Sequence, residues 1–244
     1  MTSLSTASNA HNTSDASLHD RLLDEWGMAV VCGDVAEGER LPEPGMDGDA
    51  APSRTVTREV TRVLESMGLV SVKRKAGATA NPIAAWNVFD PQVIGWRLRS
   101  PYRIEALHEL SQLRAAVEPA AARLAATNAT NEHWATLTGA AIDMVAHSDH
   151  ANEQPYLDAD VLFHRTLLEA SGNLMFAALG DVIASTLTGR TQHELMPAVA
   201  DQTALNLHTE VAALIRKGDG EGAEGAMRSI VSESDEAISR IAGK

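Results

Sequence analysis

The segment from Ser53 to Val70, SRTVTREVTRVLESMGLV, separates apolar and basic residues at the period of an α-helix. At about 100° per residue, one stripe is apolar and the opposite stripe carries arginines at successive i,i+4 steps. A helix with one buried face and one arginine face suits the major groove of DNA, although an ordinary amphipathic helix with a solvated face shows the same pattern. The apolar stripe holds Val56, Val60, Val63, Leu64 and Met67, and the basic stripe holds Arg54, Arg58 and Arg62.

The residues after this helix favour the DNA-binding interpretation. Gly68 ends the helical pattern, Leu69 to Val72 is typical of a short strand, and a basic turn containing glycine follows. This order predicts a recognition helix followed by a β wing. The residues predicted to contact DNA are Ser53, Arg54, Thr55, Arg58, Arg62, Lys73, Arg74 and Gly77.

The charge of the chain is distributed unevenly. Residues 54–75 contain six basic and two acidic side chains and carry +4, whereas the whole chain carries −13. From residue 100 onward there are ten basic and twenty acidic residues. A general affinity for polyanions is therefore excluded, and a local phosphate-binding surface remains.

Length and composition predict two soluble domains. The 244 residues are enough for two hydrophobic cores. The single cysteine, Cys32, excludes an internal disulfide and fits a reducing cytoplasm. No apolar run approaches the roughly 18 to 20 residues that a membrane span needs, so we expect a cytoplasmic protein with no membrane partner. Residues 1–16 are poor in large apolar side chains and are predicted to be a disordered leader.

The sequence predicts a mainly α chain in two parts. A winged helix-turn-helix with a small β wing is expected over residues 17–82, beginning with a helix that ends at Gly33. Residues 83–101 form an aromatic linker, and residues 102–242 show only helical patterns, which predicts an all-α bundle. The second helix of the helix-turn-helix should lie between residues 43 and 52, a segment poor in helix formers.

These parts together resemble a known family. Leu18 to Val70, with GERLP, SRTVTRE and LESMGLV, is similar to the winged helix-turn-helix of the GntR family of bacterial transcription regulators. The remainder resembles the all-helical effector domain of its FadR subgroup, called FCD, and the linker resembles that of galactonate regulators, which respond to sugar acids. The segments that carry this second resemblance are ELSQLRAAVEPAAARLAA, DVLFHRTLLEASGN and HTEVAALIRKGD.

The resemblance implies a metal site in the helical domain. Asp160 and His164 are four residues apart on a predicted helix and can share a cation, and His208 matches the family's third ligand. Oxygen and imidazole ligands suit Zn, Ni or Mn. The family's fourth ligand, a histidine, is replaced by Ile230, which cannot bind a metal. Three ligands would leave open coordination positions, and the alternative is a set of buried polar residues with no metal.

The resemblance also implies a ligand for Arg114, which occupies the position where the family offers a guanidinium to the effector. A buried guanidinium suits a small carboxylate, possibly a sugar acid. Glu118, one helical turn later, could instead pair with Arg114.

The sequence thus indicates a ligand-responsive regulator that is not an enzyme. We expect a homodimeric repressor that binds a double-stranded operator, because one short helix reads too few bases alone. Two other classes remain: an interaction module whose DNA binding is weakened by the segment 43–52, and a metal-dependent hydrolase. No HExxH motif or equivalent general base accompanies the histidines, which counts against the hydrolase.

Overall fold

The computed structural model describes residues 17–44, 52–73, 77–192 and 196–242, with side chains up to residue 233. Their contacts divide the chain into two compact units, residues 1–87 and 88–244. The predicted second helix of the helix-turn-helix, the leader 1–16 and Arg74 lie outside the described residues. None of the described helices is long and apolar enough to cross a membrane.

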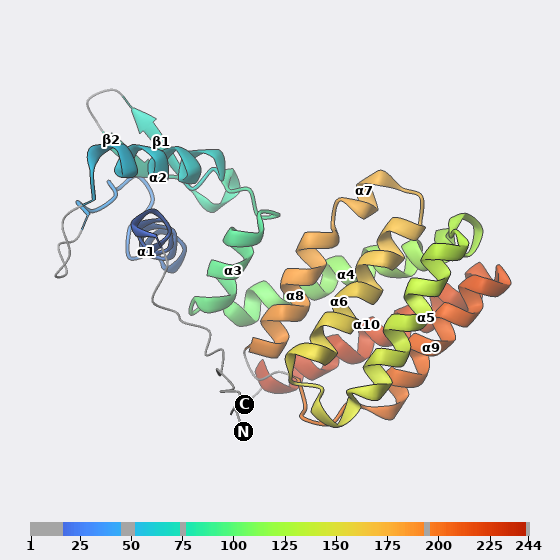
Figure 1. The fold of residues 1–244 in the computed structure, drawn as a ribbon. Helices are drawn as coiled ribbons and strands as arrows, with labels where there is room; N and C mark the ends of the chain where they lie inside the picture. Colours follow the sequence, from blue (N-terminus) through green and yellow to red (C-terminus); the bar gives the residue numbers. More distant parts are fainter. Residues whose placement is uncertain (1–16, 45–51, 74–76, 193–195, 243–244) are drawn as a thin grey trace, which may run out of the picture. The chain divides into compact units, whose positions relative to one another are not determined.

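Unit 1 is a small helical domain with a two-stranded wing (Figure 1). Its elements are α1 (Leu18–Cys32), α2 (Arg54–Ser66), β1 (Val70–Lys73), β2 (Gly77–Ala80) and the 3-10 helix η1 (Ile83–Ala85). The strands pair antiparallel, with Val70 opposite Ala80 and Lys73 opposite Gly77. Arg40 forms an isolated antiparallel bridge to Thr79 beside them.

The predicted boundaries of these elements follow from local chemistry. The Ser17 side chain accepts a hydrogen bond from the backbone of Asp20 at the start of α1, and Gly33 ends that helix in the left-handed conformation. Gly68 turns the chain from α2 into β1 with φ 75°. A Cβ there would collide with the carbonyl oxygen of Ala85, so this position requires glycine.

Unit 2 is an all-helical bundle, as predicted (Figure 1). α4 packs against α6, α9 and α10, while α5 and α8 pack against α6. One large apolar core joins these helices, with Phe163, Leu167 and Leu168 of α6 fully buried in it. The helices of the unit are α3 (Pro91–Arg99), α4 (Arg103–Asn128), α5 (Asn131–Ala146), η2 (Ser148–His150), α6 (Gln154–Ala170), α7 (Leu174–Ala177), α8 (Gly180–Gln192), α9 (Gln202–Lys217) and α10 (Gly220–Ala242).

Two segments differ from the sequence patterns. Residues 174–192 have a helical pattern throughout, but the structure divides them into two helices, α7 and α8. The linker expected over residues 83–101 contains η1 and α3, and α3 packs against α4 and α8. Ile94 and Leu98 of α3 join a core cluster with Leu107 of α4 and Val182 of α8, which anchors α3 in unit 2.

Candidate functional site

The recognition helix of unit 1 has the two faces that its sequence predicts. Val60, Leu64 and Met67 are buried, whereas Arg54, Arg58 and Arg62 are exposed. The Ser53 hydroxyl accepts a hydrogen bond from the Val56 backbone N–H at 3.3 Å, which caps the N-terminus of the helix. Arg62 donates to Glu59 at 3.0 Å, so it is shared with a carboxylate in an exposed and therefore weak pair.

A hollow of about 460 Å³ lies between this helix and the wing. Arg58 and Arg62 line it together with Gly77 of β2 and with Arg40. The sequence did not lead us to predict Arg40 as a site residue. Its position within GERLP, a segment that carries the resemblance to the DNA-binding domain, could have indicated it. Three basic side chains, Arg40, Arg58 and Arg62, line this concave surface together with Glu43 and Glu65, and Lys73 is exposed nearby at the end of β1.

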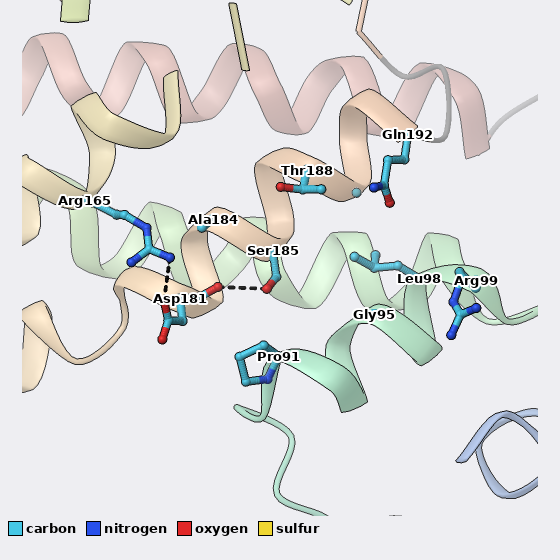
Figure 2. A pocket seen from close by; sticks show the side chains of 11 residues that line it. Pro91, Gly95, Leu98, Arg99, Arg165, Asp181, Ala184, Ser185, Thr188 and Gln192 are labelled. Atoms are coloured by element: carbon cyan, nitrogen blue, oxygen red, sulfur yellow. Dashed lines mark hydrogen bonds and ion pairs between the residues drawn. The ribbon is translucent and has the colours of Figure 1, made fainter. Parts of the chain in front are cut away.

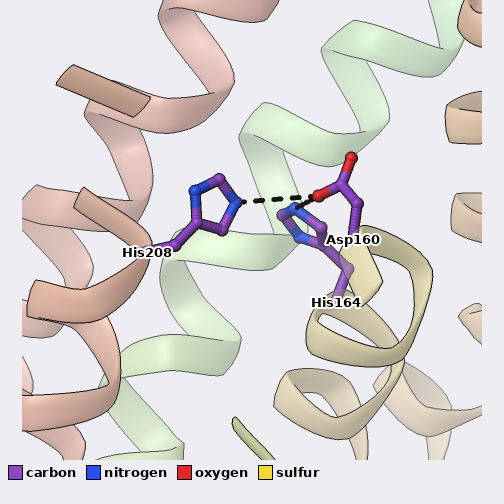
Figure 3. Close-up of side chains that lie close together, drawn as sticks. All are labelled: Asp160, His164 and His208. Carbon is purple, nitrogen blue, oxygen red and sulfur yellow. Dashed lines mark ion pairs between the residues drawn. The ribbon is translucent and has the colours of Figure 1, made fainter. Parts of the chain in front are cut away.

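Unit 2 contains a buried cluster of polar side chains. Asp160 and His164 come from α6, and His208 comes from α9. Their ligand atoms all lie within 4.8 Å of one another, and all three residues are buried. The Nε2 atoms of His164 and His208 lie 3.3 Å and 3.7 Å from the same Asp160 oxygen, as Figure 3 shows.

The outer nitrogens of both histidines are held by other groups. His208 Nδ1 lies 2.7 Å from the carbonyl oxygen of Ala204, which requires a proton on Nδ1 and leaves Nε2 free to bind a metal. His164 Nδ1 lies 2.9 Å from Glu118 Oε2, at ion-pair distance although not aligned as a hydrogen bond. A carbonyl or carboxylate behind each imidazole is the usual support of metal-binding histidines. The three residues therefore fit a divalent metal.

The charges within the cluster also fit a cation. Burial lowers the pKa of His208 to about 4, so its imidazole is neutral at pH 7. Burial would raise the pKa of Asp160, but the hydrogen bond and charge of His164 lower it well below its usual range. Burial would lower the pKa of His164, but the Glu118 carboxylate raises it. A metal at His164 must therefore displace a proton.

Arg114 lies beside this cluster but already has a carboxylate partner. Its Nε donates to Glu118 Oε1 at 2.8 Å, and its Nη2 lies 3.3 Å from Glu118 Oε2. The Nη2 atom is also 3.3 Å from His164 Nε2. Both members of the pair are buried, and burial would raise the pKa of Glu118, but Arg114 and His164 lower it to about 2. The Glu118 alternative weighed from the sequence is thus present, and only Nη1 of Arg114 lacks a partner.

Ile230, the residue that the resemblance places at the fourth ligand position, lies in an apolar environment. Ile230 of α10 is 6% exposed and belongs to the large core. Phe163 belongs to the same core, and its ring packs edge-on against both His164 and His208, with centroids 5.6 Å and 4.9 Å apart. The site therefore offers three protein ligands against an apolar wall.

A winged DNA-reading unit joined to a helical unit with a buried polar site defines a transcription regulator that senses a small molecule. Residues 109–233 match the FCD domain family. The chain is 30% identical over 224 residues to the galactonate operon transcriptional repressor of Escherichia coli K12, covering 91% of this chain and 97% of that one. It therefore belongs to the GntR family of transcription regulators with an FCD effector domain, and it is not an enzyme.

Two further comparisons agree with this assignment. The transcriptional repressor NanR of Cronobacter sakazakii is 28% identical over 220 residues, covering 87% of this chain and 82% of that one. The solved structure of the Listeria monocytogenes protein Lar matches with a TM-score of 0.55 at 17% identity, covering 94% of this chain and 100% of that one. The second likeness supports the fold alone.

Proposed function

We propose that this protein is a homodimeric repressor of an operon for catabolism of a carbohydrate acid or another carboxylate, released from its operator by that acid. The observation that carries the proposal is the buried Asp160, His164 and His208 cluster beside Arg114, in an FCD domain joined to a winged helix-turn-helix. The similarity to a repressor named for the galactonate operon supports the class of effector. Two protomers would read paired half-sites and multiply specificity.

The DNA-binding surface consists of the exposed arginines of α2 and the wing. Arg54 and Arg58 are the main candidates for base or phosphate contact, since Arg62 is shared with Glu59. Ser53, Thr55 and Gly77 would contact the sugar-phosphate backbone of the DNA. Lys73 and Arg74 would extend the DNA-binding surface along the wing. Phosphate contacts set affinity, and base contacts set sequence preference.

Arg58→Ala should weaken operator binding, because this arginine lies at the centre of the exposed basic face of α2. We expect a loss of about 1 to 3 kcal/mol if Arg58 contacts a base, or a salt slope lower by about one if it contacts a phosphate. Gel shifts across a salt series measure both quantities. Arg165→Ala is the control, because it removes the same charge from the helical unit. A folded Arg58→Ala protein with unchanged affinity and salt slope would exclude this surface.

The effector would bind at the metal cluster of unit 2. Asp160, His164 and His208 would hold a divalent Zn, Ni or Mn ion, which would supply a Lewis acid for oxygen ligands. Glu118 and the Ala204 carbonyl orient the two imidazoles. Nη1 of Arg114 offers a hydrogen bond to an incoming carboxylate. These groups favour a ligand with a carboxylate and a neighbouring hydroxyl group.

Addition of the right acid should release the protein from its operator. The acid must bind the DNA-free conformation more tightly, since equal affinity for both states shifts no equilibrium. Gel shifts with galactonate, glucuronate and malate, each with and without a chelator, test this expectation. We expect release by at least one acid, and we expect the chelator to prevent it. Release by neutral sugars tested in parallel would contradict the carboxylate effector. The absence of release by any of the acids would contradict it as well.

A further inference from the structure

A second arginine, Arg190, lies on the buried face of α8. Ile183, Thr186 and Leu187 of this helix are buried, and Arg190 follows them at the same helical spacing. The opposite face of α8 borders a separate pocket of about 310 Å³ with α3, where Figure 2 shows Ser185, Thr188 and Gln192 but not Arg190. The Arg190 side chain therefore faces the bundle, where the residue is partly buried and its Nε is inaccessible to solvent.

Arg190 has no anionic partner among the residues that the structure describes. No described carboxylate forms an ion pair with it, and its Nε is inaccessible to solvent without a hydrogen bond. Burial, and next the charge of Arg114, lower the pKa of Arg190 to about 10. Asp160, Tyr156 and Glu118 act on it in the opposite direction. α8 packs against α4, which carries Arg114, and against α6, which carries Asp160 and His164, so the buried Nε of Arg190 lies on a helix that borders the polar cluster.

The unpaired atoms around this site are all nitrogens. Within the described part of unit 2, the buried side-chain atoms without a hydrogen bond are Arg114 Nη1, His164 Nδ1, Arg190 Nε and His208 Nε2. They come from α4, α6, α8 and α9, which surround the metal cluster. Arg114 Nη1 and Arg190 Nε are donors without an acceptor, whereas the two imidazole nitrogens face the Glu118 and Asp160 carboxylates. The two guanidinium groups therefore suit a ligand that brings acceptors and negative charge.

We propose that Arg190 is the main anchor of the effector's carboxylate, which it binds together with Nη1 of Arg114. This assignment rests on the proposed function, in which a small carboxylate enters this site. Glu118 occupies Nε and Nη2 of Arg114, so one nitrogen of that guanidinium remains, whereas no described carboxylate occupies Arg190. An anion between the two guanidinium groups removes their repulsion and completes the hydrogen bonds of both.

Arg190→Gln separates a ligand-binding role from a structural one. In the full-length protein, titration calorimetry with galactonate, glucuronate and malate should show binding about 10- to 100-fold weaker than in the unchanged protein. The thermal midpoint without ligand should stay the same or rise, because the substitution removes a buried charge that has no partner. Arg165→Gln is the matched control: Arg165 pairs with Asp181, its side chain is 40% exposed, and its removal should leave acid affinity unchanged.

A lower thermal midpoint, failure to fold, or unchanged acid affinity in Arg190→Gln overturns the assignment, because Arg190 then stabilises the bundle or stands apart from the ligand. Arg190→Lys should recover part of the affinity, since it keeps the charge but not the planar pair of donors. If the unchanged protein binds none of the acids, the proposed effector class itself fails. If it binds one and Arg190→Gln binds it equally well, only the role of Arg190 fails.

Discussion

Glu118→Gln should lower the free energy of unfolding of the helical unit by about 3 to 5 kcal/mol, the usual cost of removing one member of a buried ion pair. Glu118 is fully buried and is the only described carboxylate that contacts Arg114 at ion-pair distance. Its Oε2 also lies 2.9 Å from His164 Nδ1. The amide keeps the shape of the side chain but leaves the Arg114 charge without a counter-ion in the core.

Denaturant unfolding of the full chain, followed by the signal of the helical bundle, measures this effect. Glu169→Gln is the matched control, because Glu169 is exposed on α6 and its neutralisation should change stability by no more than about 0.5 kcal/mol. The double variant Arg114→Leu, Glu118→Leu should recover most of the stability lost in Glu118→Gln, since no charge remains unpaired. A loss below about 1 kcal/mol in Glu118→Gln would mean that solvent or another group reaches Arg114.

The sequence predicted the elements whose side-chain directions follow from local geometry. The apolar and basic stripes of α2 are separated by the helical period alone, and the structure buries Val60 and Leu64 while exposing Arg54 and Arg58. Asp160 and His164 are one turn apart on α6 and meet for the same reason.

Contacts between helices could be predicted from the sequence only in part. Arg114 and Glu118 are an i,i+4 pair, so the sequence offered their ion pair as an alternative to the favoured effector contact. Tertiary packing buries both groups, and the ion pair is present. Arg190 was overlooked, although its spacing from Ile183 and Leu187 was a usable signal. Its approach to Arg114 depends on how α8 packs against α4 and α6, which no local pattern encodes.

Asp160→Ala should reduce the metal affinity of the helical unit by more than about 100-fold, or about 2.7 kcal/mol. Loss of an outer hydrogen-bond partner of a ligand typically costs about 10- to 100-fold, so loss of one of three ligands costs at least as much. Asp160 also neutralises the site, because one of its oxygens faces both His164 and His208. Elemental analysis and metal titration of protein purified without a histidine tag measure the change. Equal metal content in both proteins would show that the cluster is a metal-free polar core.

Ile230→His should have the opposite effect and raise metal affinity. In the resembling family a histidine stands at this position of the last helix, and a fourth ligand would fill one open coordination position. Ile230 is buried in the core that also holds Phe163, whose ring touches both imidazoles, so an imidazole at residue 230 would enter the bundle from α10. Ile230→Asn is the control, since it introduces polarity without an imidazole, and it should destabilise the bundle without strengthening metal binding. If Ile230→His binds metal no more tightly than the unchanged protein, residue 230 does not face the three ligands. If affinity rises while the response to acids weakens, the open coordination position left by Ile230 is the one that the effector uses.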